Sequence, residues 1–202
     1  MRRIAKAVVA LAALALGSTA WAQGAPHQHD GFFFRPELGV AYLKSSASQQ
    51  GNDFAVYGGA ADLSVAVGGA VAENLILAAH LYSTAASNPD VEVNGLKGST
   101  SDTTNGLVGL GPQLTYYFMP VNLYLSGTLA LTRVVSKSNG VEGKTDFGLG
   151  ARFAVGKEWW VSDNWGLGLS AHVGLSSNKD QGAGAPTVGS WTSGVSFSAT
   201  YN

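Results

Sequence analysis

Between Gly148 and Ser176 the sequence alternates between large apolar residues and small ones, with a polar break in the middle. Before the break, the apolar residues of one parity are Leu149, Ala151, Phe153 and Val155. After the break, they are Trp165, Leu167, Leu169, Ala171, Val173 and Leu175. A period of two is typical of a β-strand, so this stretch predicts a hairpin with its turn at residues 162–164.

The opposite parity of this hairpin consists mostly of glycine and serine, with an occasional charge. A water-soluble sandwich would bury its large residues and present charged ones to solvent. Here the polar face is too small and too uncharged for a solvated surface. Small inward residues suit the narrow lumen of a barrel, and a continuous apolar face suits lipid.

The same alternation recurs along the chain and predicts about eight strands. They are expected at residues 32–44, 57–71, 75–83, 106–118, 123–135, 148–160, 165–176 and 188–202. Short connections at 72–74, 119–122 and 162–164 alternate with longer polar loops at 45–53, 84–105, 137–144 and 177–186. The predicted fold is all-β: a closed, antiparallel, up-and-down transmembrane barrel with short periplasmic turns and longer extracellular loops. Lipid offers no hydrogen-bond partners, so the first strand must pair with the last.

The N-terminus has the composition of a secretory signal peptide. Arg2, Arg3 and Lys6 precede an apolar run at residues 7–16, and Ala20-Trp21-Ala22 forms a small-residue cleavage site. We therefore expect a signal peptide at 1–22, an N-terminal lead-in at 23–31 and the barrel at 32–202. Export and a barrel together predict the cell outer membrane of a Gram-negative bacterium.

Composition narrows the function classes further. Without the predicted signal peptide, nine basic residues stand against 13 acidic ones, a net charge of about −4, so no nucleic-acid partner is expected. Cysteine is absent, so the fold must hold without disulfides. Glycine accounts for 27 of the 202 residues, which fits a small barrel whose inward positions must be small.

Aromatic residues fall near the predicted strand ends, as the two girdles of a membrane barrel require. At the periplasmic ends we expect Phe34, Tyr116, Phe118, Trp159, Trp165 and Tyr201. At the outer ends we expect Tyr42, Tyr57, Phe147 and Trp191.

Several charged or titratable residues have inward parity and define the candidate site, a polar network in the lumen. Its predicted members are Arg35, Glu37, Asp62, His80, Arg152, Glu158 and His172. Unpaired charges in a narrow lumen would be costly, so Arg152 is expected to bridge Asp62 or Glu37. Such a network would fill and stiffen the barrel, and the alternative is a gated narrow pore. Arg133 and Lys157 have outward parity near opposite rims, where their side chains can reach lipid headgroups, including lipopolysaccharide phosphate for Arg133.

From Phe32 to Tyr201 the pattern resembles the eight-stranded outer-membrane barrels of the OmpA type, in their transmembrane domain, and of the OmpX type. The resemblance implies a barrel-assembly machinery that reads a terminal aromatic residue, here Tyr201 followed by Asn202. It also implies outer-membrane lipids and lipopolysaccharide as surroundings, and a monomer is expected.

Other patterns offer competing chemistry. His172 with Ser176, Ser177 and Glu158 invites comparison with the His, Ser and Glu of outer-membrane lipid A deacylases, but His172 has inward parity. His27 and His29 lie two apart and could share a metal ion, but a flexible terminal segment is the favoured interpretation. Gly166-x-Gly168-x-x-Ala171 lies inside a strand, so it does not predict a dinucleotide site. No cofactor and no metal are expected.

These observations favour a non-enzymatic barrel with a largely filled lumen and a structural or surface-interaction role, above all through residues 84–105. The first alternative is a narrow pore or a transporter of small molecules, which could be hydrophobic. The second is a lipid A-modifying enzyme.

Overall fold

The computed structural model of the protein describes residues 29–182 and 184–202. Eight long strands form one closed antiparallel barrel. Their bounds are β1 (Phe32–Gln49), β2 (Asn52–Ala72), β3 (Leu75–Ser87), β6 (Thr103–Phe118), β7 (Leu123–Ser138), β9 (Gly148–Trp160), β10 (Trp165–Lys179) and β11 (Thr187–Tyr201). Three four-residue strands extend it: β4 (Asp90–Val93), β5 (Leu96–Ser99) and β8 (Val141–Lys144). No helix in the described ranges is long and apolar enough to cross a membrane.

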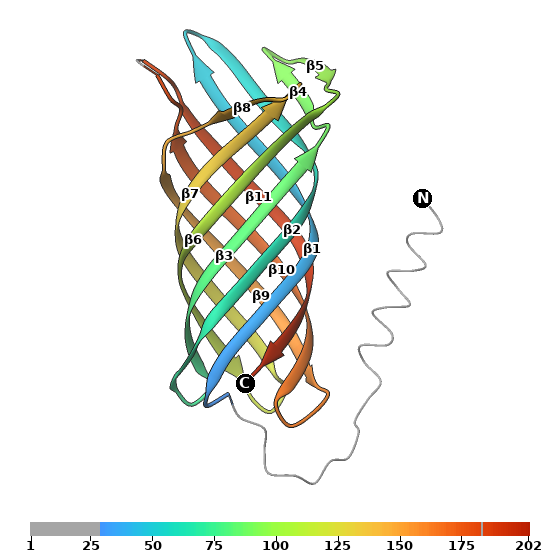
Figure 1. Ribbon diagram of the computed structural model, residues 1–202, viewed down its shortest axis with the longest axis vertical. Coiled ribbons are helices and arrows are strands. Elements are labelled where there is room, and N and C mark those ends of the chain that lie inside the picture. Colours follow the sequence, from blue (N-terminus) through green and yellow to red (C-terminus); the bar gives the residue numbers. More distant parts are fainter. Residues whose placement is uncertain (1–28, 183) are drawn as a thin grey trace, which may run out of the picture.

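Each long strand pairs with its sequence neighbours, and the ring closes between the first strand and the last (Figure 1). Closure runs from the pair Phe34 and Tyr201 to the pair Ser46 and Gly189. Since every barrel strand has two partners, no sheet edge faces the surroundings along the wall. The predicted fold class is therefore confirmed.

The two ends of the barrel differ (Figure 1). At the short-turn end, tight connections at 73–74, 119–122 and 161–164 join the strands, and the barrel's first and last strands begin and end there. At the long-hairpin end, the strands run on into three projecting hairpins: β1–β2, β4–β5 and β7–β8. Turns at the short-turn end need a left-handed residue, as at Asn74 with φ 59° and Asn122 with φ 54°.

Much of what the sequence predicted as loop at the long-hairpin end is paired strand. Residues 45–49 and 52–53 continue β1 and β2, and most of 137–144 belongs to β7 and β8. The 84–105 segment holds the β4–β5 hairpin as well as the ends of β3 and β6. Three two-residue turns, Gln50-Gly51, Asn94-Gly95 and Asn139-Gly140, have positive φ at both positions, the type I′ geometry that matches strand twist. Outside the membrane a strand needs no apolar face, so its polar composition resembled that of a loop.

The alternation of side chains separates two environments. Inward positions are buried, and the large outward residues remain exposed, for example Leu129 at 70% and Leu149 at 71%. The girdle residues share the outward face at the two predicted levels. At the long-hairpin end the Tyr42 ring lies 5.5 Å from that of Trp191 and 6.4 Å from that of Tyr57. At the short-turn end the Tyr201 ring lies 5.4 Å from that of Trp165. The predicted signal peptide lies outside the described residues.

Candidate functional site

Glycines on the inner wall make room for large side chains of the neighbouring strand. The Tyr82 ring lies against Gly109 and the Tyr124 ring lies against Gly156, each so closely that a Cβ on the glycine would overlap the ring. The missing side chain of one strand therefore makes room for the ring of another. This complementarity fills the barrel interior and holds its polar residues in fixed positions.

A buried ion pair lies at the middle of the lumen. Arg152 on β9 donates from both terminal nitrogens to Asp62 on β2, at 2.6 and 3.0 Å. The two strands are not neighbours, so the pair spans the interior. Thr84 donates to Asp62 Oδ2 at 2.5 Å, and His172 Nε2 lies 3.7 Å from the same oxygen. Asp62 is one of the two partners that the sequence predicted for Arg152.

A second cluster surrounds Arg35, nearer the short-turn end. Its guanidinium lies 3.5 Å from Glu37 and 4.0 Å from Glu158, and it donates to Gln113 Oε1 at 3.1 Å. It also lies 4.5 Å from the centre of the Tyr124 ring, in cation–π contact. One buried cation therefore faces two buried carboxylates and an aromatic surface.

Hydroxyl groups donate to three of the four carboxylate oxygens of this cluster, and Glu158 Oε2 has no hydrogen-bond partner. Tyr117 and Thr200 donate to Glu158 Oε1 at 3.0 and 2.6 Å. Ser64 donates to Glu37 at 2.8 Å, and Tyr124 does so at 3.4 Å. Buried charges are tolerated when such hydrogen bonds replace water.

Gln113 connects Arg35 to the last predicted member, His80. Gln113 Nε2 lies 3.1 Å from both His80 Nδ1 and Thr128 Oγ1, and His80 Nδ1 lies 2.8 Å from Thr128 Oγ1. The seven residues predicted for the network thus all lie in the lumen, in two clusters, one around Arg152 and one around Arg35. The sequence analysis did not predict four further members of the network: Thr84, Gln113, Tyr117 and Tyr124. Only their inward parity could have indicated that they belong to it.

His29 closes the short-turn end of the lumen. Its side chain is fully buried and stacks on Tyr117, with ring centres 3.5 Å apart and an interplanar angle of 14°. Its ring nitrogens lie 3.0 Å from Asn122 Oδ1 and 2.8 Å from Asn202 Oδ1. The sequence treated His29 as part of a flexible lead-in or of a metal pair with His27, whose placement lies outside the described residues. The flexible interpretation is wrong at His29, because the ring is fixed by stacking and by amides from distant strand ends, whereas the metal pair with His27 stays a prediction.

We expect His29→Ala to lower the free energy of unfolding by about 1–3 kcal/mol, since it removes the ring's polar contacts with Asn122 and Asn202 and a stacked ring. The measurement is denaturant unfolding of the refolded protein in detergent. The control is Asp30→Ala, at the neighbouring exposed position. Equal stabilities of the two variants would contradict a plug formed by His29.

Two apolar layers share the lumen with the charged clusters. Toward the short-turn end, Phe33, Ala66, Ile76 and Ala78 pack around Tyr117 and Tyr124. Toward the long-hairpin end, the layer consists of Leu43, Ala60, Ala86, Leu107 and Val134, with Ala41 and Val188 packed against it. The lumen therefore holds an apolar layer toward the long-hairpin end, the two ion clusters, and the His29 plug at the short-turn end. The second apolar layer surrounds the Arg35 cluster, which Phe33, Tyr117 and Tyr124 contact directly.

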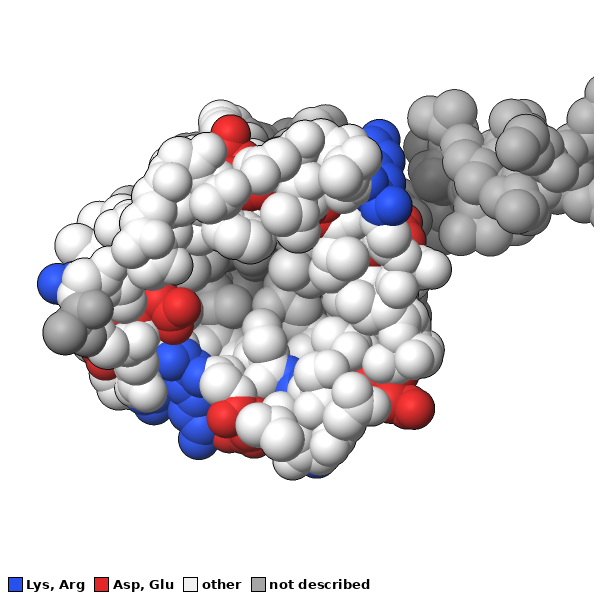
Figure 2. Space-filling view, turned by 90° about the horizontal axis from the view of Figure 1, so that it is seen from above, with Lys and Arg blue, Asp and Glu red and all other residues white. Residues whose placement is uncertain are grey.

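Above the upper apolar layer the barrel opens into a cavity of about 430 Å³, here called the cup (Figure 2). Its lining residues are Ser45, Ser46, Ala47, Phe54, Val56, Asn105, Val134, Ser136, Gly143, Lys144, Thr145, Asp180, Gln181 and Val188. Figure 2 shows the hollow from the long-hairpin end, with charged side chains at its margin rather than at its centre. At this margin Lys144 binds Glu142 at 2.7 Å, and this hydrogen bond lowers the pKa of the Glu142 carboxyl.

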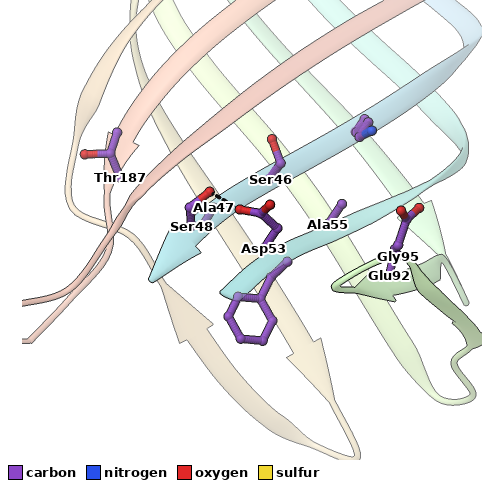
Figure 3. Close-up of a pocket in the computed structure, with 10 residues that line it drawn as sticks. Ser46, Ala47, Ser48, Asp53, Ala55, Glu92, Gly95 and Thr187 are labelled. Atoms are coloured by element: carbon purple, nitrogen blue, oxygen red, sulfur yellow. Dashed lines mark hydrogen bonds between the residues drawn. The ribbon is translucent and has the colours of Figure 1, made fainter. Parts of the chain in front are cut away.

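A second hollow, of about 520 Å³, lies beside the β1–β2 hairpin (Figure 3). Lys44, Ser46, Asp53, Glu92 and Thr187 are among its lining residues. Ser48 and Asp53, which face each other across the hairpin, are joined by a hydrogen bond of 2.5 Å. This hollow is polar and carries charges of both signs.

The outward basic residues lie over aromatic rings at opposite rims. Arg133 Cζ lies 4.8 Å from the centre of the Phe147 ring, and its Nε donates to the Thr145 carbonyl at 2.8 Å. Lys157 Nζ lies 5.6 Å from the Trp159 ring and donates to the Val121 carbonyl at 2.6 Å. Each charge is thus held near a strand end by an aromatic ring and a backbone carbonyl.

Comparison with known proteins rests on structure. No family model matches the chain, and no curated protein sequence matches it significantly. Among solved structures, Neisserial surface protein A is 17% identical with a TM-score of 0.56, over 83% of this chain and 96% of that one. OprG from Pseudomonas aeruginosa is 15% identical with a TM-score of 0.49, over 88% and 100%. The outer membrane protease OmpT from Escherichia coli is 11% identical with a TM-score of 0.41, over 91% and 99%.

The fold is that of a small outer-membrane β-barrel. At these identities the likeness concerns the architecture alone. What distinguishes this outer-membrane-type barrel must come from its own lumen, cup and hairpins.

The lumen of this barrel does not assemble the catalytic groups considered from sequence. His172 faces Asp62 inside the barrel, and neither of its ring nitrogens has a hydrogen-bond partner. Ser176 lies on the same strand with its hydroxyl unbonded. In residues 29–182 and 184–202 no three His, Cys, Asp or Glu side chains form a group that could hold a metal ion.

Proposed function

We propose that the protein is a non-enzymatic, integral outer-membrane barrel of a Gram-negative bacterium, which acts through the surface at its long-hairpin end while its lumen stays closed. The observation that carries this proposal is the filled lumen. Two ion clusters, two apolar layers and the His29 plug occupy the interior. A barrel closed in this way has no passage through its lumen, so its function is expected at the surfaces of its two ends.

The exposed apolar belt supports a membrane location. Leucine, valine and phenylalanine cover the outward face between the two aromatic levels, and a water-soluble barrel would not expose such a continuous surface. In this proposal the short-turn end faces the periplasm and the long-hairpin end faces outward. The partners are outer-membrane lipids, lipopolysaccharide at the outer rim, and the barrel-assembly machinery during insertion. The barrel works as a monomer.

The first test is gel migration with and without boiling. A closed barrel resists detergent, so the unboiled protein should migrate differently from the boiled chain. Identical migration of both samples after refolding in detergent would contradict the proposal, because it would mean that no closed barrel had formed.

The second test is conductance in a planar lipid bilayer. We expect no reproducible channels, because ion clusters and apolar layers block the lumen. An open porin inserted in the same way provides the control for incorporation. Stable, reproducible conductance steps from the wild-type barrel would contradict a closed lumen.

One observation favours a narrow pore as the second candidate. On β10 and β11 the buried hydroxyls of Ser176, Ser196 and Ser198 have no hydrogen-bond partner. Unbonded buried hydroxyls can bind water, so this wall would be the path of a pore. Under that alternative, Ser196→Val would reduce conductance. The lipid A-modifying alternative is tested separately by mass spectrometry of lipid A after expression, where an altered acylation pattern would favour it.

A further inference from the structure

Ser45, Asn105 and Ser136 form the floor of the cup, and they belong to a chain of hydrogen-bonded, uncharged side chains that continues to Ser190. Ser45 on β1 and Ser190 on β11 are bonded at 2.9 Å, and Asn105 on β6 donates to Ser45 at 3.2 Å. Ser136 on β7 donates to Asn105 Oδ1 at 2.8 Å, so the chain links four strands. The Asn105 amide group is thereby fixed in orientation, and one of its two N–H donors is used by Ser45.

This floor fixes what a ligand at the bottom of the cup must offer. Ser45, Asn105 and Ser190 are buried at 6, 2 and 5% exposure, and Ser136, which completes the chain, is exposed to the cup. A purely apolar ligand that covered the floor would leave the remaining donors and acceptors without partners, at a cost for each group. The ligand must therefore carry hydroxyl or amide groups of its own.

The walls of the cup set a second requirement, because they are largely apolar. Phe54, at 43% exposure, lines the cavity together with Val56 and Val188. An exposed aromatic ring beside fixed polar groups offers a stacking surface for a flat apolar face. The ligand thus combines hydrogen-bonding groups at its edge with an apolar face.

Charge sets the third requirement. The lining residues include one cation, Lys144, and one anion, Asp180. The ammonium group of Lys144 is already bound to Glu142 at 2.7 Å. The cup therefore has no excess charge with which to hold an ionic ligand. Gln181 adds another uncharged amide at the rim.

We infer that the cup binds a neutral saccharide, one or two pyranose units, presented at the cell exterior. A pyranose ring carries hydroxyls around its edge and C–H groups on its face, which meets all three requirements. The cavity of about 430 Å³ lies in the usual range for small-ligand sites. The inference rests on the proposed function, because the cup meets outside saccharides only if the long-hairpin end faces outward.

The test uses the full refolded barrel in a zwitterionic detergent, because sugar-based detergents would compete for the cup. Free glucose, galactose, N-acetylglucosamine, lactose and maltose are probed by saturation-transfer difference NMR, with titration of any sugar that responds. We expect ring-proton signals for at least one sugar. Phe54→Ala should weaken its binding about tenfold, and Gln181→Ala should do so to a smaller extent.

Phe147→Ala is the matched control, since Phe147 is also an exposed aromatic residue near the long-hairpin end but does not line the cup. It should leave binding unchanged. Gel migration of every variant must match that of the wild-type barrel, which separates loss of the site from loss of the fold. A folded, closed barrel that binds none of the five sugars overturns this inference and leaves the proposed function standing. Binding that Phe147→Ala weakens as much as Phe54→Ala, or binding of a phenol but of no sugar, also overturns it.

Discussion

Arg152→Ala should lower the free energy of unfolding by about 3–5 kcal/mol, one of the two largest effects expected for a single substitution in this barrel. The reason is that the substitution leaves the carboxylate of Asp62 in the lumen without its cationic partner. Asp62 is fully buried and receives two hydrogen bonds from Arg152. Without the guanidinium, only Thr84 donates to this carboxylate, and a charge without a counterion remains in the interior.

The measurement is denaturant unfolding of the refolded barrel, followed by a double-mutant cycle with Asp62→Ala. The double variant should be destabilised by clearly less than the sum of the two single variants, since it removes both charges together. Arg133→Ala is the control, because that guanidinium lies on the outward face over Phe147. If Arg152→Ala proved no more harmful than Arg133→Ala, the lumen network would not hold the barrel together.

The second large effect is expected on the opposite face of the wall. Leu129→Lys should cost about 2–4 kcal/mol when the protein is folded into a lipid bilayer, the range for a basic residue at the midplane of a membrane barrel. Leu129 is 70% exposed and lies halfway along β7 with outward parity. In the bilayer, this position is surrounded by hydrocarbon, where an ammonium group has no water or counterion.

Val141→Lys is a sharp comparison, because Val141 is 74% exposed in the β7–β8 hairpin. The two positions have similar exposure and opposite expected outcomes, since only Leu129 lies within the membrane-spanning wall. Unfolding from lipid vesicles measures both. Similar small effects at the two positions would mean that the leucine-rich belt faces water, and the membrane assignment would have to be abandoned.

The strands of the barrel wall could be predicted from the sequence because the two faces of the wall have different surroundings. Inside the membrane, Leu149 and its neighbours of the same parity must be apolar, and Gly148 and its neighbours must be small, so a period of two is imposed on the residues themselves. Strand number and inward positions followed from this constraint. Above the membrane that constraint is absent, which is why residues 45–49 resembled a loop although they are paired with β2.

The lumen site could be predicted only as a set of residues. Parity placed Arg35, Glu37 and Arg152 inside the barrel, but parity does not determine which charges meet. Glu37 lies two residues from Arg35 on the same face of β1, and the two pair with each other. Contacts across the barrel, such as Arg152 with Asp62, depend on how the strands are staggered around the ring. The burial of His29 depends on the same geometry, because its amide partners, Asn122 and Asn202, come from strand ends far apart in sequence.

The pairing of β1 with β11 brings the two ends of the barrel chain together. Phe32 and Tyr201 are neighbours at the short-turn end, with ring centres 6.2 Å apart. In space, the ring of strands therefore has no first or last member. The same ring could be formed by a chain that begins and ends at a different strand. A circularly permuted chain, with a short linker joining these ends and new termini at the Asn139-Gly140 turn, would preserve every strand pair except the small β7–β8 hairpin.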